Sequence, residues 1–295
     1  MPILFDGKPA QFMPQSNATS PDAEVIVIDA TRSLDWLDLR ELWRYRDLVW
    51  IFAVRDITVR YRQTVVGIAW TLLQPLALMF ALGLFTKMIS SEPVEGAVPT
   101  PIRTLTGLLL YQLFAGIITV STNCLLDNRQ MLTKVYFPRM ALPLAASMRP
   151  LIDFVVGIAL LGAMMIWFGV TPSPQIVLAP IVVLMTILSA LGFGLWLSAL
   201  NAHYRDFSHI VPFSLQLGLI VSPIASDSTR VPEAWRWLYF ANPMAALLDA
   251  FRWAVLGLRF PAWDELTISF LVSSMMLVTG VWYFRRVDRF LADSI

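Results

Sequence analysis

Three arginines stand directly ahead of the first long apolar segment of the chain. Arg55, Arg60 and Arg62 precede residues 65–89, whose only formal charge is Lys87. A guanidinium matches phosphate oxygens in bidentate fashion, so these side chains could form a polar mouth for an anionic ligand that carries phosphate. Cationic flanks are also the general rule at the cytoplasmic ends of membrane helices. The charges leave two interpretations open, a substrate site and a topology signal.

The composition places the chain among integral membrane proteins. Of the 295 residues, 57% are hydrophobic and only 15% are charged, and the mean hydropathy is +0.64. Soluble domains are about one quarter charged. The net charge of +1 gives no global field that would attract nucleic acid. Cys124 is the only cysteine, which excludes an intrachain disulfide and a cysteine metal cluster.

The apolar stretches predict six membrane-spanning helices in an all-α fold. About 20 apolar residues cross a hydrocarbon core of roughly 30 Å, and residues 65–89 are long enough to do so. Five more stretches follow, at 102–126, about 140–170, about 176–200, from about 209 to Pro223, and 266–284. If the N-terminus is cytoplasmic, most arginines and lysines fall in cytoplasmic segments. The positive-inside rule therefore predicts that both termini are cytoplasmic.

The first 62 residues are expected to lie outside the membrane core. Residues 1–33 are rich in Pro, Ser, Asn and Asp, which predicts a disordered cytoplasmic tail. From Leu34 to about Ile51 one helical side is apolar, with Trp36, Leu39, Leu42, Trp43, Val49 and Trp50. Such a pattern predicts an amphipathic helix in the membrane interface, and a helix that faces a protein partner is the alternative. Residues 34–62 thus comprise this helix and the arginine-rich segment, and residues 63–295 form the transmembrane domain.

Residues 231–257 interrupt the regular order of spans. They are apolar but carry Glu233, Arg236, Asp249 and Arg252, and they are broken at Asn242-Pro243. A seventh span here would move the C-terminal arginines to the external side. A re-entrant pair of half-helices between spans five and six resolves this conflict, and a broken backbone at that depth is tolerated only where protein or a water-filled cavity covers it. Asp249 and Arg252, like Arg149 and Asp153, are spaced as local pairs.

Two cytoplasmic loops combine charges with aromatic residues, as protein interfaces often do. The first covers residues 127–138 and the second residues 201–208. A solvated loop is the alternative for each. The candidate docking residues are Arg129, Lys134, Tyr136, Phe137, Tyr204 and Arg205.

Three stretches together resemble the membrane subunit of type-2 ABC exporters for polysaccharides, which move O-antigen, capsule or teichoic acid chains. They are RDLVWIFAVRDITVRYRQTVVGIAWTLLQPL, YFPRMALPLAA and VPEAWRWLYFANPMAALLDAFR. The resemblance covers nearly the whole chain after residue 33. It departs from the family pattern at residues 222–233, where an aromatic residue often follows the proline-aliphatic pair.

The resemblance implies a homodimer that works with two copies of a separate ATPase. It implies that the two loops are coupling helices, that residues 231–257 form gate helices, and that the substrate is a glycan on undecaprenyl pyrophosphate in the bacterial inner membrane. Arg55, Arg60 and Arg62 would receive the pyrophosphate where the substrate enters. A path for sugar needs aromatic faces, so a subset of the aromatic candidates is expected to point inward, while a lipid-facing or interfacial position is the alternative for each. The candidates are Trp70, Phe80, Phe85, Tyr111, Phe114, Trp235, Trp237 and Tyr239.

The chain is not expected to be an enzyme or to hold a cofactor. None of Lys8, Lys87 and Lys134 completes a glycine-rich nucleotide-binding loop, so ATP and Mg²⁺ are expected on the partner ATPase. An ABC-2 exporter of drugs or lipids is one alternative function. A membrane-embedded transferase is another, but His203 and His209 lack metal-ligand spacing.

Overall fold

The described part of the chain is entirely helical. In this computed structural model the described residues are 43–62, 67–89, 98–132, 137–224, 239–240 and 242–293. All of them belong to the second of two compact units, Asp38–Ile295. No β-strand occurs among them, which confirms the all-α class. The predicted tail at residues 1–33 and the first part of the predicted interface helix lie outside the described residues.

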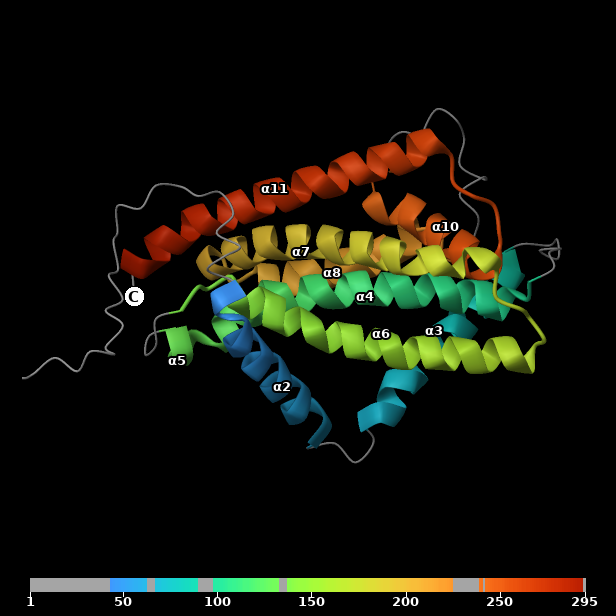
Figure 1. The fold of residues 1–295 in the computed structure, drawn as a ribbon, viewed down its shortest axis with the longest axis horizontal. Coiled ribbons are helices and arrows are strands. Elements are labelled where there is room, and N and C mark those ends of the chain that lie inside the picture. Colours follow the sequence, from blue (N-terminus) through green and yellow to red (C-terminus); the bar gives the residue numbers. More distant parts are fainter. Residues whose placement is uncertain are drawn as a thin grey trace, which may run out of the picture. The chain divides into compact units, whose positions relative to one another are not determined.

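Helix α4, Thr100–Asp127, is the centre of the bundle. It packs along α6, Ala141–Trp167, and along α7, Ala179–His203, and Figure 1 shows it between these two helices. Its side chains are buried over nearly the whole length, from Ile102 to Leu125. A helix that is apolar all round is expected inside a bundle. The bounds agree closely with the stretches predicted as spans two, three and four.

Small residues allow α7 to approach its neighbours closely. A Cβ atom at Gly192 would lie 2.6 Å from the backbone nitrogen of Leu277 on α11, Trp263–Asp293. One at Gly194 would lie 2.7 Å from the Cβ atom of Ser121 on α4. Small residues at helix contacts favour association in membranes because the backbones can meet. In Figure 1, α11 accordingly runs beside α7.

The sequence predicted that the interface helix ends near Ile51, but helix α2, Arg46–Arg62, runs without a break at that residue. The helix continues through the arginines because residues 52–62 contain neither glycine nor proline. One face packs on α6 and buries Phe52 and Ala53. The opposite face exposes Trp50. On the predicted apolar side, Val49 is partly buried in the core, whereas Trp50 beside it is exposed.

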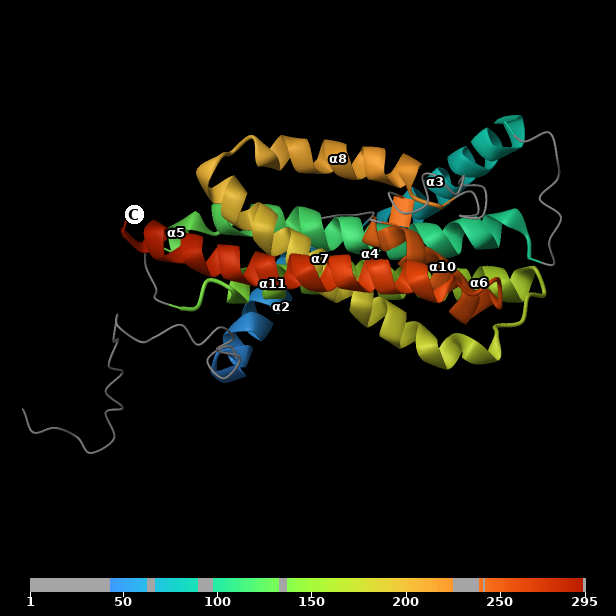
Figure 2. The same cartoon turned by 90° about the horizontal axis from the view of Figure 1, so that it is seen from above.

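Four helical segments in the described residues are long and apolar enough to cross a membrane. They are Thr100–Asp127, Ala141–Trp167, Pro174–His203 and Trp263–Asp288, where the third includes the 3₁₀ turn η1, Pro174–Leu178. Helices α3, Gly67–Ile89, and α8, Phe207–Val221, contain shorter apolar segments. Figure 2 shows α8 and α6 on opposite sides of α4. The chain is thus a multi-pass membrane protein.

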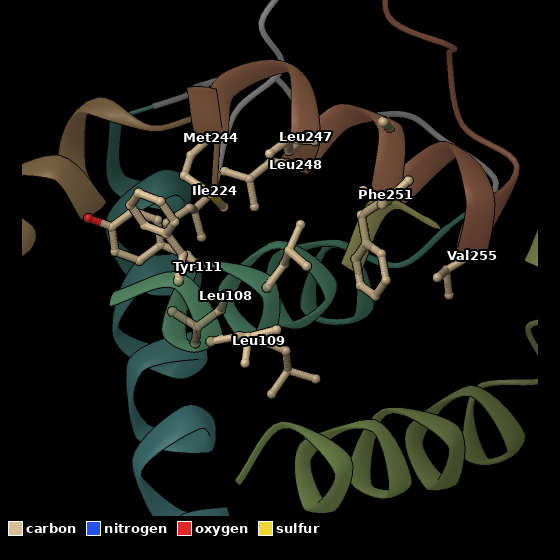
Figure 3. Close-up of a cluster of buried hydrophobic side chains, with 14 of the residues drawn as sticks. Leu108, Leu109, Tyr111, Ile224, Met244, Leu247, Leu248, Phe251 and Val255 are labelled. Carbon is tan, nitrogen blue, oxygen red and sulfur yellow. The ribbon is translucent and has the colours of Figure 1, made fainter. Parts of the chain in front are cut away.

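Helix α10, Pro243–Leu256, begins at the predicted Asn242-Pro243 break. The side chain of Asn242 caps it by accepting a hydrogen bond from the backbone N–H of Met244 at 3.1 Å. Gly257 ends it with a left-handed φ of 68°. Figure 3 shows Leu247, Leu248 and Phe251 pointing from α10 toward α4. Residues 231–238, at the start of the predicted re-entrant segment 231–257, lie outside the described residues.

The bundle has two ends that matter for function. The α5 end holds the short helix α5, Arg129–Leu132, together with residues 203–206 and the C-terminal part of α11. The α10 end holds η1 and α10, which contact each other.

Candidate functional site

Arg55 points its guanidinium into the protein at the α5 end. Its Nε and Nη2 atoms lie 2.9 and 2.7 Å from Oδ1 of Asp56. The Nη2 atom also donates to Oδ1 of Asn128 at 2.7 Å, and Nη1 lies 3.0 Å from the sulfur of Met131. The cation stands 5.2 Å from the ring centre of Phe52. These partners satisfy the guanidinium within the chain.

Arg60 lies on the same helix and forms an ion pair with another helix. Its Nη1 atom is 3.1 Å from Oδ2 of Asp153 on α6, and both side chains are about one quarter to one third exposed. Asp153 is twelve residues into α6, which is roughly 18 Å along the helix at 1.5 Å per residue. The sequence spacing suggested Arg149 as the neighbour of Asp153, and it gave no signal for this contact between helices. An ionisable residue at such a depth is a functional candidate.

Of the three arginines predicted to form an anion site, the structure describes the side chains of two, Arg55 and Arg60. Arg55 and Arg60 turn to different partners, the first toward α4 and α5 and the second toward α6. The side chain of Arg62 lies outside the described residues. An anionic ligand at Arg60 would have to compete with the carboxylate of Asp153.

The two predicted docking loops both lie at the α5 end. The first contains α5, on which Arg129 is exposed. Tyr204 is 64% exposed in the second, and Arg205 is exposed beside it. Unlike these exposed docking candidates, Phe137 is buried, and its ring centre lies 5.4 Å from that of Phe52. Its ring holds the loop on α2 and is not available at the surface. Lys134 and Tyr136 lie outside the described residues.

The six predicted channel aromatics that the structure describes fall into three groups. Tyr111 and Phe114 are buried within α4, where Tyr111 donates to the carbonyl of Leu215 on α8. Tyr239 is partly buried and packs edge-on to Phe240. Three further aromatics share the exposed side of α3, namely Trp70, Phe80 and Phe85. Trp235 and Trp237 lie outside the described residues. Only the α3 group presents open ring faces in the described part of a single subunit.

A buried ion pair at the α10 end confirms one local pair and adds a contact that the sequence did not indicate. Arg252 is 2% exposed, and its Nη1 atom lies 3.6 Å from Oδ1 of Asp249. Its Nη2 atom donates to the backbone carbonyl of Ile224. The i, i+3 spacing predicted the pair, whereas the carbonyl belongs to the segment that follows α8.

Comparison with known proteins agrees with this architecture. The sequence profile of the family described as ABC-2 type transporter matches residues 47–256, more than half of the chain. The chain is 29% identical over 259 residues to the O-antigen export system permease protein RfbA of Myxococcus xanthus, covering 87% of this chain and 98% of that protein. It is 24% identical over 250 residues to the protein of the same name from Klebsiella pneumoniae, covering 84% and 95%. The chain therefore belongs to the ABC-2 type transporter family.

Proposed function

We propose that this chain is the membrane-spanning subunit of an ATP-driven exporter that moves lipid-linked O-antigen across the bacterial inner membrane. The observation that carries the proposal is the alignment with the Myxococcus xanthus O-antigen permease, which spans 98% of that protein and most of this chain. A match of this extent includes the helices and the loops between them. As an ABC transporter permease, the chain is a transporter subunit and depends on an ATPase subunit for energy.

In this proposal the subunit has six spans with both termini in the cytoplasm. The four longer segments are four of these spans, and helices α3 and α8, of 23 and 15 residues, are the other two. The α5 end faces the cytoplasm because the positive-inside rule places arginines there. The described arginines at this end include Arg129, Arg139, Arg205, Arg285 and Arg286.

The ATPase is proposed to dock at the α5 end, with α5 and residues 204–205 as its contacts. Exposed Arg129, Tyr204 and Arg205 offer charge and an aromatic ring, which suit a protein interface. Two copies of this chain and two of the ATPase would form the working transporter.

The substrate is proposed to be a glycan on undecaprenyl pyrophosphate that reaches the protein at Arg60 and Arg62. Moving the pyrophosphate charge into hydrocarbon without a partner would cost several kcal/mol or more. Arg60 is a cation within the helical bundle and already forms an ion pair with an anionic side chain, that of Asp153. The aromatic face of α3 supports sugar passage because rings bind the apolar faces of sugars.

Deletion of the gene in its host tests the function directly. Loss of O-antigen from the cell surface, with lipid-linked chains accumulating inside, is the expected phenotype, and a plasmid copy should restore export. Surface O-antigen at the wild-type level in the deletion strain would contradict the proposal.

A further inference from the structure

Arg55 differs from Arg46 and Arg60 of α2 in that it contacts the segment between α4 and α5. It bonds with the point where α4 ends and α5 begins, 73 residues away in the sequence. Its second long-range contact, with Met131, lies on α5 itself. Arg55 therefore joins α2 to the proposed ATPase-docking loop.

Asn128 lies between α4 and α5 and forms hydrogen bonds with both helices. Its backbone carbonyl accepts hydrogen bonds from the N–H groups of Met131 and Leu132, at 2.9 and 3.2 Å. Its side-chain Nδ2 donates to the carbonyl of Cys124 at 2.9 Å, near the end of α4. The remaining side-chain oxygen accepts from Arg55. A change in the angle between α4 and α5 would thus act on Arg55.

Helix α2 touches both ends of this loop with the same face. Phe52 and Arg55 are three residues apart, so they lie side by side on the helix. Arg55 contacts Asn128 near the start of the loop, and Phe52 packs on Phe137 near its end. The loop is therefore fastened to α2 at two points.

The helix extends this connection to the proposed substrate site. Arg60 follows Arg55 by five residues, roughly 7.5 Å along the helix. Helix α2 is continuous from Arg46 to Arg62, so a shift at Arg55 is transmitted to Arg60. Packed elements respond to small shifts by moving between discrete arrangements.

We infer that Arg55 is a positioning residue that transmits movement of the ATPase-docking helix α5 to α2 and, through α2, to Arg60. The guanidinium suits this role because its planar fork bridges Asp56, Asn128 and Met131 at once. The inference rests on the proposed function, since it requires an ATPase at the α5 end. It replaces the role of pyrophosphate ligand that the sequence suggested for Arg55.

Cysteine labelling of the assembled transporter tests the connection. Cys124 is the only cysteine and is buried, so Val59→Cys, at a position 58% exposed on α2, would supply the accessible thiol of this chain. The labelling rate with a water-soluble maleimide is measured with and without ATP. Asn128→Leu removes the oxygen that Arg55 contacts while leaving Arg55 intact. Asn128→Asp is the matched control, because it keeps an oxygen that Arg55 can contact while it replaces the amide donor with a second, negatively charged oxygen.

The expected result is an ATP-dependent labelling rate in the parent and in Asn128→Asp, and loss of this dependence in Asn128→Leu with the ATPase still bound. An unchanged ATP response in Asn128→Leu would overturn the inference, as would a parent protein that shows no ATP response. Loss of the bound ATPase from Asn128→Leu would also overturn it, because Asn128 would then serve docking. Failure of the parent to bind any ATPase would instead count against the proposed function.

Discussion

The guanidinium of Arg252 occupies the space into which a side chain at Gly107 would project. A Cβ atom at Gly107 would lie 2.7 Å from Nη2 and 3.3 Å from Cζ of Arg252. The same guanidinium pairs with Asp249 and donates to the carbonyl of Ile224. One buried cation thus joins α10, α4 and the segment after α8. Arg252 can occupy this position because Gly107 in α4 has no side chain.

Gly107→Ala is expected to lower the stability of the folded subunit by about 1–3 kcal/mol, because overpacking displaces a buried side chain. Thermal unfolding in detergent, followed by tryptophan fluorescence, measures the change. Gly162→Ala is the matched control, since nothing lies within 4 Å of a Cβ atom at that position in α6. There the substitution should be neutral or stabilising by up to about 1 kcal/mol. Equal unfolding temperatures for Gly107→Ala and wild type would show that the space is not limiting.

Arg252→Met is expected to cost about 3–5 kcal/mol, because it removes the cation that forms an ion pair with the buried Asp249 carboxylate. The double variant Asp249→Leu, Arg252→Met removes both charges and should recover part of that loss. The comparison uses the same unfolding measurement. If the double variant is as unstable as the sum of the two single variants, the two residues do not act as a pair.

Charge reversal at the docking surface should weaken assembly with the ATPase. Arg129→Glu and Arg205→Glu place negative charge on the exposed α5 end, and complementary charge at an interface chiefly controls association. Recovery of the ATPase on the tagged permease should fall by severalfold while the permease remains folded. Arg259→Glu is the control, because Arg259 is exposed beyond the end of α10. If all three variants recover equal amounts of ATPase, Arg129 and Arg205 do not contribute to docking.

The sequence predicted the helices well because the signal for a membrane span is local. A run of apolar residues of bilayer length defines a span without reference to the rest of the fold. The second span was predicted at residues 102–126 and is observed as Thr100–Asp127. The Asn242-Pro243 break similarly marks the start of α10, since proline is favoured at the first turn of a helix.

The sequence could not predict which distant side chains meet. Arg55 with Asn128 and Arg60 with Asp153 are contacts between helices, and charge and spacing along one helix contain no information about them. The burial of Phe137 was missed for the same reason, because its partner Phe52 lies on α2. Exposed aromatic and buried aromatic residues also look alike in an apolar sequence, as Phe80 and Phe114 show. The candidate site was therefore predicted as a set of residues but not as a geometry.

The role of Arg60 is decided by comparing it with its partner Asp153. If Arg60 receives the pyrophosphate, the double variant Arg60→Gln, Arg62→Gln should lose most surface O-antigen, while Arg60→Lys retains part of it because the charge remains without the planar fork. Asp153→Asn removes the competing anion at 3.1 Å and should preserve or raise export. If Arg60 only fastens α2 to α6, Asp153→Asn should impair export as much as Arg60→Gln does, since either change breaks the same ion pair. Surface O-antigen in cells with equal amounts of inserted permease separates these results. Wild-type export by the double glutamine variant would reduce Arg60 and Arg62 to topology signals.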